Sequence, residues 1–252
     1  MGALTLASIG TTHPWNIAGI GLDARVAQRL EARHVMVVAG VSAQGDSERV
    51  AAALDPAIIA AQMRAIRSAR PDAYRIGALL SAQSALAVAA GLEGVNVPVV
   101  CDPVAASSDG LVFADDATLE ALRTLFRLCT LVTPNMDEAS RLCGFPVSDR
   151  ATMAGAAQML VERDHARAAL VTGGHLENEA TDVLYANGTT STFVGTHIAG
   201  GMRGTGCVLA AAAAIYLARG ENIIDAITAA RALVRDAIAH SAQWNGERVW
   251  PY

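Results

Sequence analysis

Short apolar runs, rich in β-branched residues, alternate along the chain with amphipathic segments, and this alternation limits the possible folds. The runs lie at 4–9, 35–41, 74–79, 97–102, 130–134 and 168–173. The segments between them predict helices over 22–33, 56–69, 81–92, 115–127, 135–143 and 150–163. Because parallel strands need crossover connections of this kind, we predict an α/β fold, a three-layer α/β/α sandwich around a mostly parallel central sheet.

The chain departs from this rhythm after residue 173. The segment 182–195 carries Ala-Asn-Gly-Thr between two alternating runs, which predicts a β-hairpin. Two long helices are expected over 204–219 and 223–244, and the first should be buried because it is apolar nearly all round. No composition break, repeat or linker divides the sequence, so we expect a single domain over 1–252, with 11–21 and 40–46 as a candidate lid.

The composition favours small ligands over macromolecular ones. Hydrophobic residues make up 52% of the chain and charged residues 17%, with a net charge of −5. An acidic balance excludes a broad basic surface for nucleic acid or for an anionic membrane. All nineteen cationic residues are arginine, which excludes any mechanism that depends on lysine.

The cysteines and the hydropathy pattern indicate the cellular location of the protein. The four cysteines, at positions 101, 129, 143 and 207, lack C-x-x-C spacing, which predicts reduced thiols rather than a zinc or redox site. The N-terminal segment has no basic region, and the apolar run after Cys207 is too short to span a bilayer. We therefore expect a cytoplasmic protein without membrane contact.

Ligands of open α/β sheets bind beyond the carboxyl ends of the strands. In this chain the strand ends are followed by GTTHPW, GVSAQG, CDPVAASSDG, TPNMDE and TGGH. These segments are small, polar and acidic. The sequence therefore predicts a substrate cleft at this edge of the sheet.

The stretch GGMRGTGC, residues 200–207, comes directly before the long apolar helix. Its backbone N–H groups are unobstructed and the helix dipole is positive here, so a phosphate would fit, although a glycine turn that packs a helix closely is the competing interpretation. A functional Cys207 at this position would have a lowered thiol pKa, whereas a structural cysteine would be inert.

Further candidate residues follow the middle strands. Asn135 and Glu138 lie three apart at a helix start, where they could hold a hydrated Mg²⁺ or form a capping box. Asp102 ends an apolar strand before a proline, and it either caps the next turn or binds a metal. The glycines after Thr172 allow a ligand to approach closely or form a plain tight turn.

These pieces, in the order AQG, CDPV, TPNMDEASRLCG, VTGGH with DVLY, and RGTGC, resemble the hydroxymethylpyrimidine and phosphomethylpyrimidine kinases of thiamine biosynthesis, within the ribokinase-like superfamily. The resemblance implies phosphoryl transfer from MgATP to 4-amino-5-hydroxymethyl-2-methylpyrimidine or its monophosphate, by a homodimer. A pyridoxal or other small-molecule kinase, and a non-catalytic pyrimidine-binding regulator, are the alternatives.

The resemblance also implies roles for individual residues. The implied catalytic group is Arg203, Gly204, Thr205, Gly206 and Cys207, with the Cys207 thiolate as a base. The implied substrate-binding residues are Gln44, Gly19, Asp23 and Trp15. The implied ATP-binding residues are Asn135, Thr172, Gly173 and Gly174, and the implied metal ligands are Glu138 and Asp102.

Two segments depart from the family pattern. The first loop reads GTTHPWNIAGIGLD where the family has GTDPSGGAGIQAD, so Thr12 and His13 surround the position of the usual aspartate. Thr172 stands where a lysine usually precedes the glycines, and Arg203 could supply that charge from the other side. Because Arg203 also suits an acceptor that already carries a phosphate, we predict a preference for the monophosphate.

Overall fold

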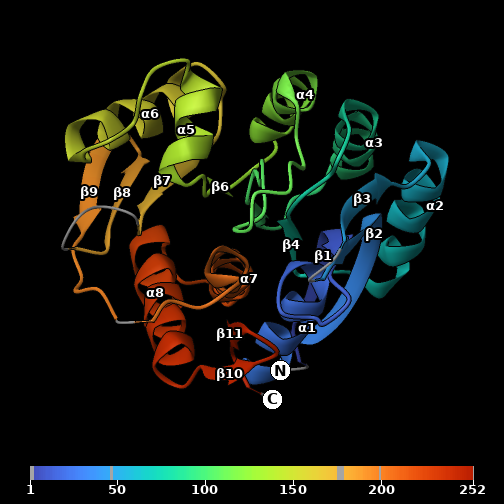
Figure 1. Cartoon of the computed structure of the whole chain (residues 1–252). Coiled ribbons are helices and arrows are strands. Elements are labelled where there is room, and N and C mark those ends of the chain that lie inside the picture. Colours follow the sequence, from blue (N-terminus) through green and yellow to red (C-terminus); the bar gives the residue numbers. More distant parts are fainter. Residues whose placement is uncertain (1–2, 46–47, 175–178, 199, 252) are drawn as a thin grey trace.

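The centre of the molecule is a nine-stranded sheet with the order β3-β2-β1-β4-β5-β6-β7-β8-β9 (Figure 1). The structure is a computed structural model that describes residues 3–45, 48–174, 179–198 and 200–251. The strands are β1 (Thr5–Thr12), β2 (Arg33–Gln44), β3 (Arg49–Ala53), β4 (Ala73–Ile76), β5 (Val99–Cys101), β6 (Leu131–Val132), β7 (Ala168–Gly173), β8 (Thr181–Ala186) and β9 (Thr189–Phe193). From β2 to β7 in this order neighbouring strands run parallel, which confirms the mostly parallel sheet.

Helices cover both faces of the sheet (Figure 1). One face carries α2 (Pro56–Ile66), α3 (Ala82–Leu92), α4 (Asp116–Phe126), α5 (Met136–Cys143) and α6 (Arg150–Glu162). The other face carries α1 (Gly19–Arg29), α7 (Thr205–Ala218) and α8 (Ile223–Ala239). Each face has its own buried core, so the predicted three-layer sandwich is confirmed. None of the described helices is long and apolar enough to cross a membrane.

Helix α7 packs on the middle of the sheet, against β1, β4 and β5. Its buried segment from Val208 to Ile215 contains five consecutive alanines, whose small side chains let the helix approach the strands closely. This central position brings the first turn of α7 to the edge of the sheet where the parallel strands end.

The structure corrects the predicted C-terminal helix. Helix α8 ends at Ala239, and Ala242–Trp244 forms the strand β10, which pairs with β11 (Glu247–Val249). The turn between them is Asn245-Gly246, with positive φ at both residues, as a tight hairpin requires. The predicted hairpin over 182–195 is confirmed by β8 and β9.

Part of the candidate lid belongs to the central sheet. Thr11 and Thr12 belong to β1, and the segment 40–44 belongs to β2, which pairs with the unpredicted strand β3. Residue 46, the end of the predicted lid, lies outside the described residues. The first helix also begins earlier than predicted, at Gly19.

Candidate functional site

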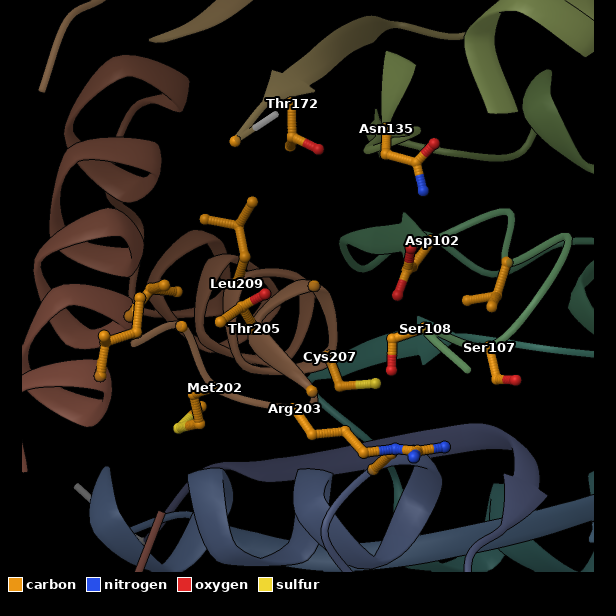
Figure 2. A pocket seen from close by; sticks show the side chains of 18 of the residues that line it. Asp102, Ser107, Ser108, Asn135, Thr172, Met202, Arg203, Thr205, Cys207 and Leu209 are labelled. Carbon is orange, nitrogen blue, oxygen red and sulfur yellow. The ribbon is translucent and has the colours of Figure 1, made fainter. Parts of the chain in front are cut away.

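A cleft of about 990 Å³ opens at the carboxyl ends of the parallel strands, as predicted. It is bounded by the ends of β1, β2 and β7, by the segments after β5 and β6, by the first turn of α7 and by the hairpin of β10 and β11. Figure 2 shows Asp102, Asn135 and Thr172 on one side and Thr205 and Cys207 at the start of α7.

Most of the predicted site residues line this cleft. They are Gly19, Gln44, Asp102, Asn135, Glu138, Thr172, Gly174, Arg203, Gly204, Thr205, Gly206 and Cys207. The three that do not line it are Trp15, Asp23 and Gly173. Asp23 is fully buried behind the cleft, and the Gly173 N–H donates a hydrogen bond to Asp182 instead.

The first turn of α7 leaves its backbone N–H groups without a side-chain cap, although those groups have no partner within the helix. The cap residue Gly204 has φ of +86°, and a Cβ on it would lie 2.6 Å from the Ile17 carbonyl oxygen. Only glycine fits there. The close packing at Gly204 is therefore confirmed. Because Thr205 and Gly206 line the cleft, the uncapped N–H groups are open to a ligand, and the anion site stays a prediction.

The opposite wall, which we call the acidic side, consists of Asp102, Asn135, Glu138 and Thr172. Asn135 and Glu138 form a capping box, in which each side chain accepts the backbone N–H of the other, at 2.8 and 2.9 Å. A bridge between Asn135 and Thr172 fixes the neighbouring segment. The carboxylate of Asp102 faces α7, because a Cβ on Gly206 would lie 3.7 Å from Asp102 Oδ2.

Both carboxyl groups on the acidic side have pKa values above their usual range. Burial and, to a smaller extent, the neighbouring Asp102 together raise the pKa of Glu138 to about 8. Burial also raises the pKa of Asp102, although the Arg75 guanidinium opposes this effect. Two carboxylates of this kind suit a hydrated Mg²⁺, which proteins typically hold through one or two carboxylates together with substrate phosphates. No group of three or more His, Cys, Asp or Glu side chains able to hold a metal occurs among the described residues.

Arg75, which the sequence analysis did not single out, lies beneath the first turn of α7. Its guanidinium contacts the Asp102 carboxylate at 2.6 Å and the Asp23 carboxylate at 3.2 Å, and its side chain is 1% exposed. Asp23 therefore acts as the buried partner of this arginine. The available signal was an arginine inside an otherwise apolar run, because a charge at such a position needs a buried partner.

Cys207 does not have the lowered thiol pKa that a functional role was expected to give it. Burial raises the pKa of Cys207 to about 11, although the Arg75 guanidinium opposes the effect. The helix dipole favours the thiolate, but the side chain is half-buried and its desolvation disfavours the thiolate more strongly. Cys207 is therefore a protonated thiol at neutral pH.

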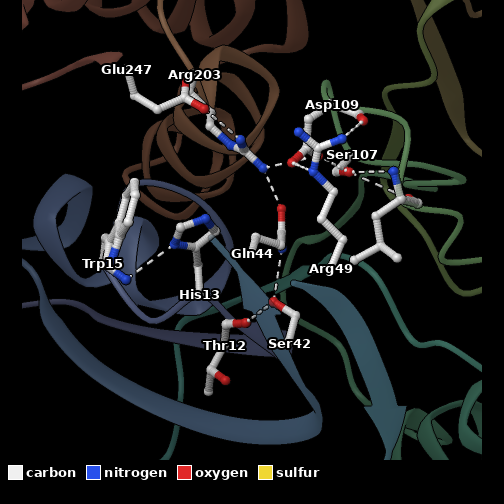
Figure 3. Close-up of polar contacts among 11 residues, drawn as sticks. Thr12, His13, Trp15, Ser42, Gln44, Arg49, Ser107, Asp109, Arg203 and Glu247 are labelled. Atoms are coloured by element: carbon white, nitrogen blue, oxygen red, sulfur yellow. Dashed lines mark hydrogen bonds and ion pairs between the residues drawn. The ribbon is translucent and has the colours of Figure 1, made fainter. Parts of the chain in front are cut away.

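The remaining wall, which we call the Arg203 side, consists of His13, Gln44, Arg203 and Glu247, and Asp109 contacts Arg203 from outside the cleft lining (Figure 3). The Arg203 guanidinium contacts Glu247 at 2.9 Å and Asp109 at 3.3 Å, and it also donates to the Gln44 side-chain oxygen. Its side chain is 6% exposed. A phosphate that binds Arg203 must therefore replace at least one of these partners.

Two tryptophan rings contact each other beside the Arg203 side. The Trp15 ring meets the Trp244 ring edge-on at 5.4 Å between centroids, and it lies 6.0 Å from the His13 ring. Trp15 therefore joins the first loop to the C-terminal hairpin. Because Trp15 does not line the cleft, stacking on a bound ring would require it to leave Trp244.

A second ion pair that the sequence did not indicate, between Asp182 and Arg231, lies next to Thr172. Asp182 on β8 accepts the Gly173 N–H at 3.0 Å and contacts Arg231 on α8 at 2.7 Å. Both residues line the cleft. Arg231 therefore brings a positive charge to the part of the cleft where a lysine would precede the glycines, although Asp182 balances it.

Comparison with known proteins agrees with this geometry. The profile of the family described as phosphomethylpyrimidine kinase matches residues 15–251. A hydroxymethylpyrimidine/phosphomethylpyrimidine kinase of Rhizobium meliloti is 34% identical, over 88% of this chain and 85% of that protein. The thiamine biosynthesis bifunctional protein ThiED of Geobacter sulfurreducens is 39% identical over 73% of this chain. The matched region covers only 38% of that longer protein.

Solved structures share the fold. A phosphomethylpyrimidine kinase of Clostridium difficile superposes with a TM-score of 0.81 and 25% identity, over 93% of this chain and 99% of that one. The pyridoxal kinase of Bacillus subtilis, in complex with ADP, superposes with a TM-score of 0.90 and 26% identity, over 99% of this chain and 97% of that one. The fold is thus the predicted ribokinase-like one. With its uncapped glycine turn facing two buried carboxylates, the chain belongs to the phosphomethylpyrimidine kinase family, which transfers phosphoryl groups.

Proposed function

We propose that this protein phosphorylates 4-amino-5-hydroxymethyl-2-methylpyrimidine phosphate with ATP, giving the pyrophosphate used in thiamine biosynthesis, and that it uses the free alcohol less well. The observation that carries the proposal is the uncapped first turn of α7 facing Asp102 across the cleft. Family membership supports the choice of a pyrimidine acceptor.

Phosphoryl transfer requires mainly positioning and neutralisation of charge. The N–H groups of Thr205, Gly206 and Cys207 would bind the transferred phosphoryl group. Asp102 and Glu138 would hold a Mg²⁺ ion, which would neutralise phosphate charge. The remaining ATP contacts are proposed for Asn135 and for the turn from Thr172 to Gly174.

The acceptor would bind on the Arg203 side. Gln44 suits an aminopyrimidine because its carbonyl oxygen accepts from an amino group and its NH₂ donates to a ring nitrogen. A phosphate monoester is anionic near neutral pH and needs no base, which agrees with the protonated Cys207 thiol. The proposed preference for the monophosphate requires that its phosphate take the place of Glu247 or Asp109 on Arg203.

Two other functions have a specific observation in their favour. The high structural similarity to a pyridoxal kinase supports pyridoxal as an alternative acceptor. Thr172, in place of a cationic residue, supports a regulator that binds the pyrimidine without catalysis. The cytoplasmic location and the homodimer expected from the family are also part of the proposal, and light scattering of the purified protein tests the dimer.

Product analysis tests the proposed reaction. The protein is incubated with MgATP and the pyrimidine monophosphate, and ADP and the pyrimidine pyrophosphate are quantified by mass spectrometry. We expect the two products in equal amounts. Tight binding of the pyrimidine without either product would identify a regulator instead.

A further inference from the structure

His13 follows β1 directly and lines the Arg203 side of the cleft, with 3% of its surface exposed. Its Nδ1 atom accepts a hydrogen bond from the Trp15 backbone N–H at 3.1 Å (Figure 3). An imidazole nitrogen that accepts a hydrogen bond carries no proton. In the neutral ring the proton must therefore be on Nε2, which makes Nε2 a donor.

This donor has no partner. Nε2 of His13 is buried and makes no hydrogen bond with any of the residues that the structure describes. A buried donor without an acceptor costs about 1–3 kcal/mol, and such groups are rare in folded proteins. Because His13 borders the cleft, a ligand bound there can supply the missing acceptor.

The surroundings keep the ring neutral. Burial and, to a smaller extent, the Arg203 guanidinium lower the pKa of His13 to about 4, although Asp109 and Glu247 oppose both effects. Arg203 cannot satisfy Nε2 because a guanidinium has no acceptor. The position thus favours a lone pair on an uncharged ring or on an oxygen atom of the ligand.

We propose that His13 is a substrate-recognition residue, whose Nε2–H donates a hydrogen bond to a lone pair of the bound acceptor. The inference rests on the proposed function for the identity of that acceptor, an aminopyrimidine. It assigns a role to a residue in the segment where this chain departs from its family pattern. His13 and Gln44 would then bind the acceptor together, because His13 directly follows β1 and Gln44 is the last residue of the neighbouring strand β2.

His34 provides a matched control. Its Nε2 is also buried without a partner among the described residues, and burial lowers its pKa to about 4 as well. His34 does not line the cleft. A buried Nε2 without a partner is therefore common to both positions, and of the two residues His13 is the one that lines the cleft.

The first test is His13→Asn. A shorter asparagine can still accept the backbone N–H two residues on, as in an Asx turn, but it lacks the Nε2 donor. We expect the KM of the pyrimidine to rise about 3- to 10-fold, which corresponds to one hydrogen bond, with the KM of ATP unchanged. His34→Asn should change neither. An unchanged KM of the pyrimidine in His13→Asn would overturn the proposal.

The second test needs no turnover. In ¹⁵N-labelled protein the His13 imidazole signal, assigned by its loss in His13→Asn, should show a proton on Nε2. Adding the pyrimidine alcohol or its monophosphate without ATP should shift that signal. A shift with both points to a ring nitrogen, which the two ligands share, and a shift with the monophosphate alone points to a phosphate oxygen.

The two tests separate this inference from the proposed function. A shift of the His13 signal without any turnover would leave the recognition role standing and overturn the kinase activity. Turnover of the pyrimidine without a shift, or a proton on Nδ1 in the free protein, would overturn the recognition role and leave the kinase activity standing. A protein that shows neither turnover nor shift would overturn both.

Discussion

The two sides of the cleft hold their polar groups in different ways. On the acidic side, the capping box joins Asn135 and Glu138, and Thr172 is fixed by the adjacent strand. On the Arg203 side, one guanidinium connects partners as far as 159 residues away in the sequence. The polar groups of the acidic side are therefore held in place by local backbone hydrogen bonds before a ligand binds, and we call this arrangement the frame. The Arg203 side consists of long-range contacts that a ligand can replace one by one.

The largest effect should come from Arg75, the buried charge on which the frame depends. Replacing Arg75 with methionine leaves two buried carboxylates without their cation. We expect the free energy of unfolding to fall by about 3–5 kcal/mol in urea titrations. Arg123→Met is the control, because its partner Asp164 keeps a second arginine, and it should cost about 1 kcal/mol or less. Equal losses in the two variants would show that the frame does not need this charge.

The next largest effect concerns the first turn of α7. In Gly206→Ala the added methyl group has ordinary contact distances and points toward Asp102, so the fold should survive while the anion site is blocked. We expect kcat to fall about 100-fold with little change in the midpoint of thermal unfolding. A kcat within twofold of the wild type would contradict an anion site here.

Gly204→Ala is the matched variant at the neighbouring position. It places a side chain at φ of +86° and against the Ile17 carbonyl oxygen. We expect it to lower the free energy of unfolding by about 1–3 kcal/mol, which Gly206→Ala should not do.

Glu138→Gln sharpens the description of the acidic side, because glutamine keeps the capping oxygen and removes the charge. The folded-state pKa of Glu138 is raised to about 8 by burial, so its contribution to stability is complete below about pH 4.5 and is lost as the pH rises toward 8. Without Mg²⁺, the variant should therefore gain stability relative to the wild type between pH 5 and 8. Parallel pH profiles would contradict the raised pKa.

The same variant tests the metal role. We expect the Mg²⁺ concentration for half-maximal turnover to rise about tenfold in Glu138→Gln. An unchanged Mg²⁺ dependence would leave Glu138 with its capping role alone.

The smallest effect is expected on the Arg203 side, at Glu247. Glu247→Gln removes one partly exposed ion pair and frees part of Arg203 for a phosphate. We expect the KM of the monophosphate to fall about 2- to 5-fold and that of the alcohol to stay constant, as the small energy of such pairs implies. Glu179→Gln, which breaks an exposed pair with Arg150, is the control. An equal fall for both acceptors would contradict phosphate binding by Arg203.

The same contrast explains what the sequence could predict. The parallel sheet was predicted correctly from the alternation of apolar runs and amphipathic segments. The capping box of Asn135 and Glu138 and the close-packed glycine turn before α7 depend on patterns within a few residues, so each was among the stated alternatives. The hairpin of β10 and β11 had a usable signal in Asn245-Gly246, but the amphipathic pattern before it was extended too far.

The rest depends on tertiary contacts. The partners of Arg203 and Arg75 lie on segments that only the folded chain brings together, so no local spacing indicates them. The Cys207 pKa was left open, because the helix dipole is visible in the sequence and the surroundings that desolvate the thiol are not.

The most direct test of the proposed function is a comparison of kcat/KM for three acceptors with MgATP: the pyrimidine monophosphate, the free hydroxymethylpyrimidine and pyridoxal. We expect the monophosphate to give the highest value, the alcohol a lower one and pyridoxal the lowest. Comparable or higher turnover of the alcohol would contradict the phosphate preference, and a higher value for pyridoxal would contradict the pyrimidine kinase itself.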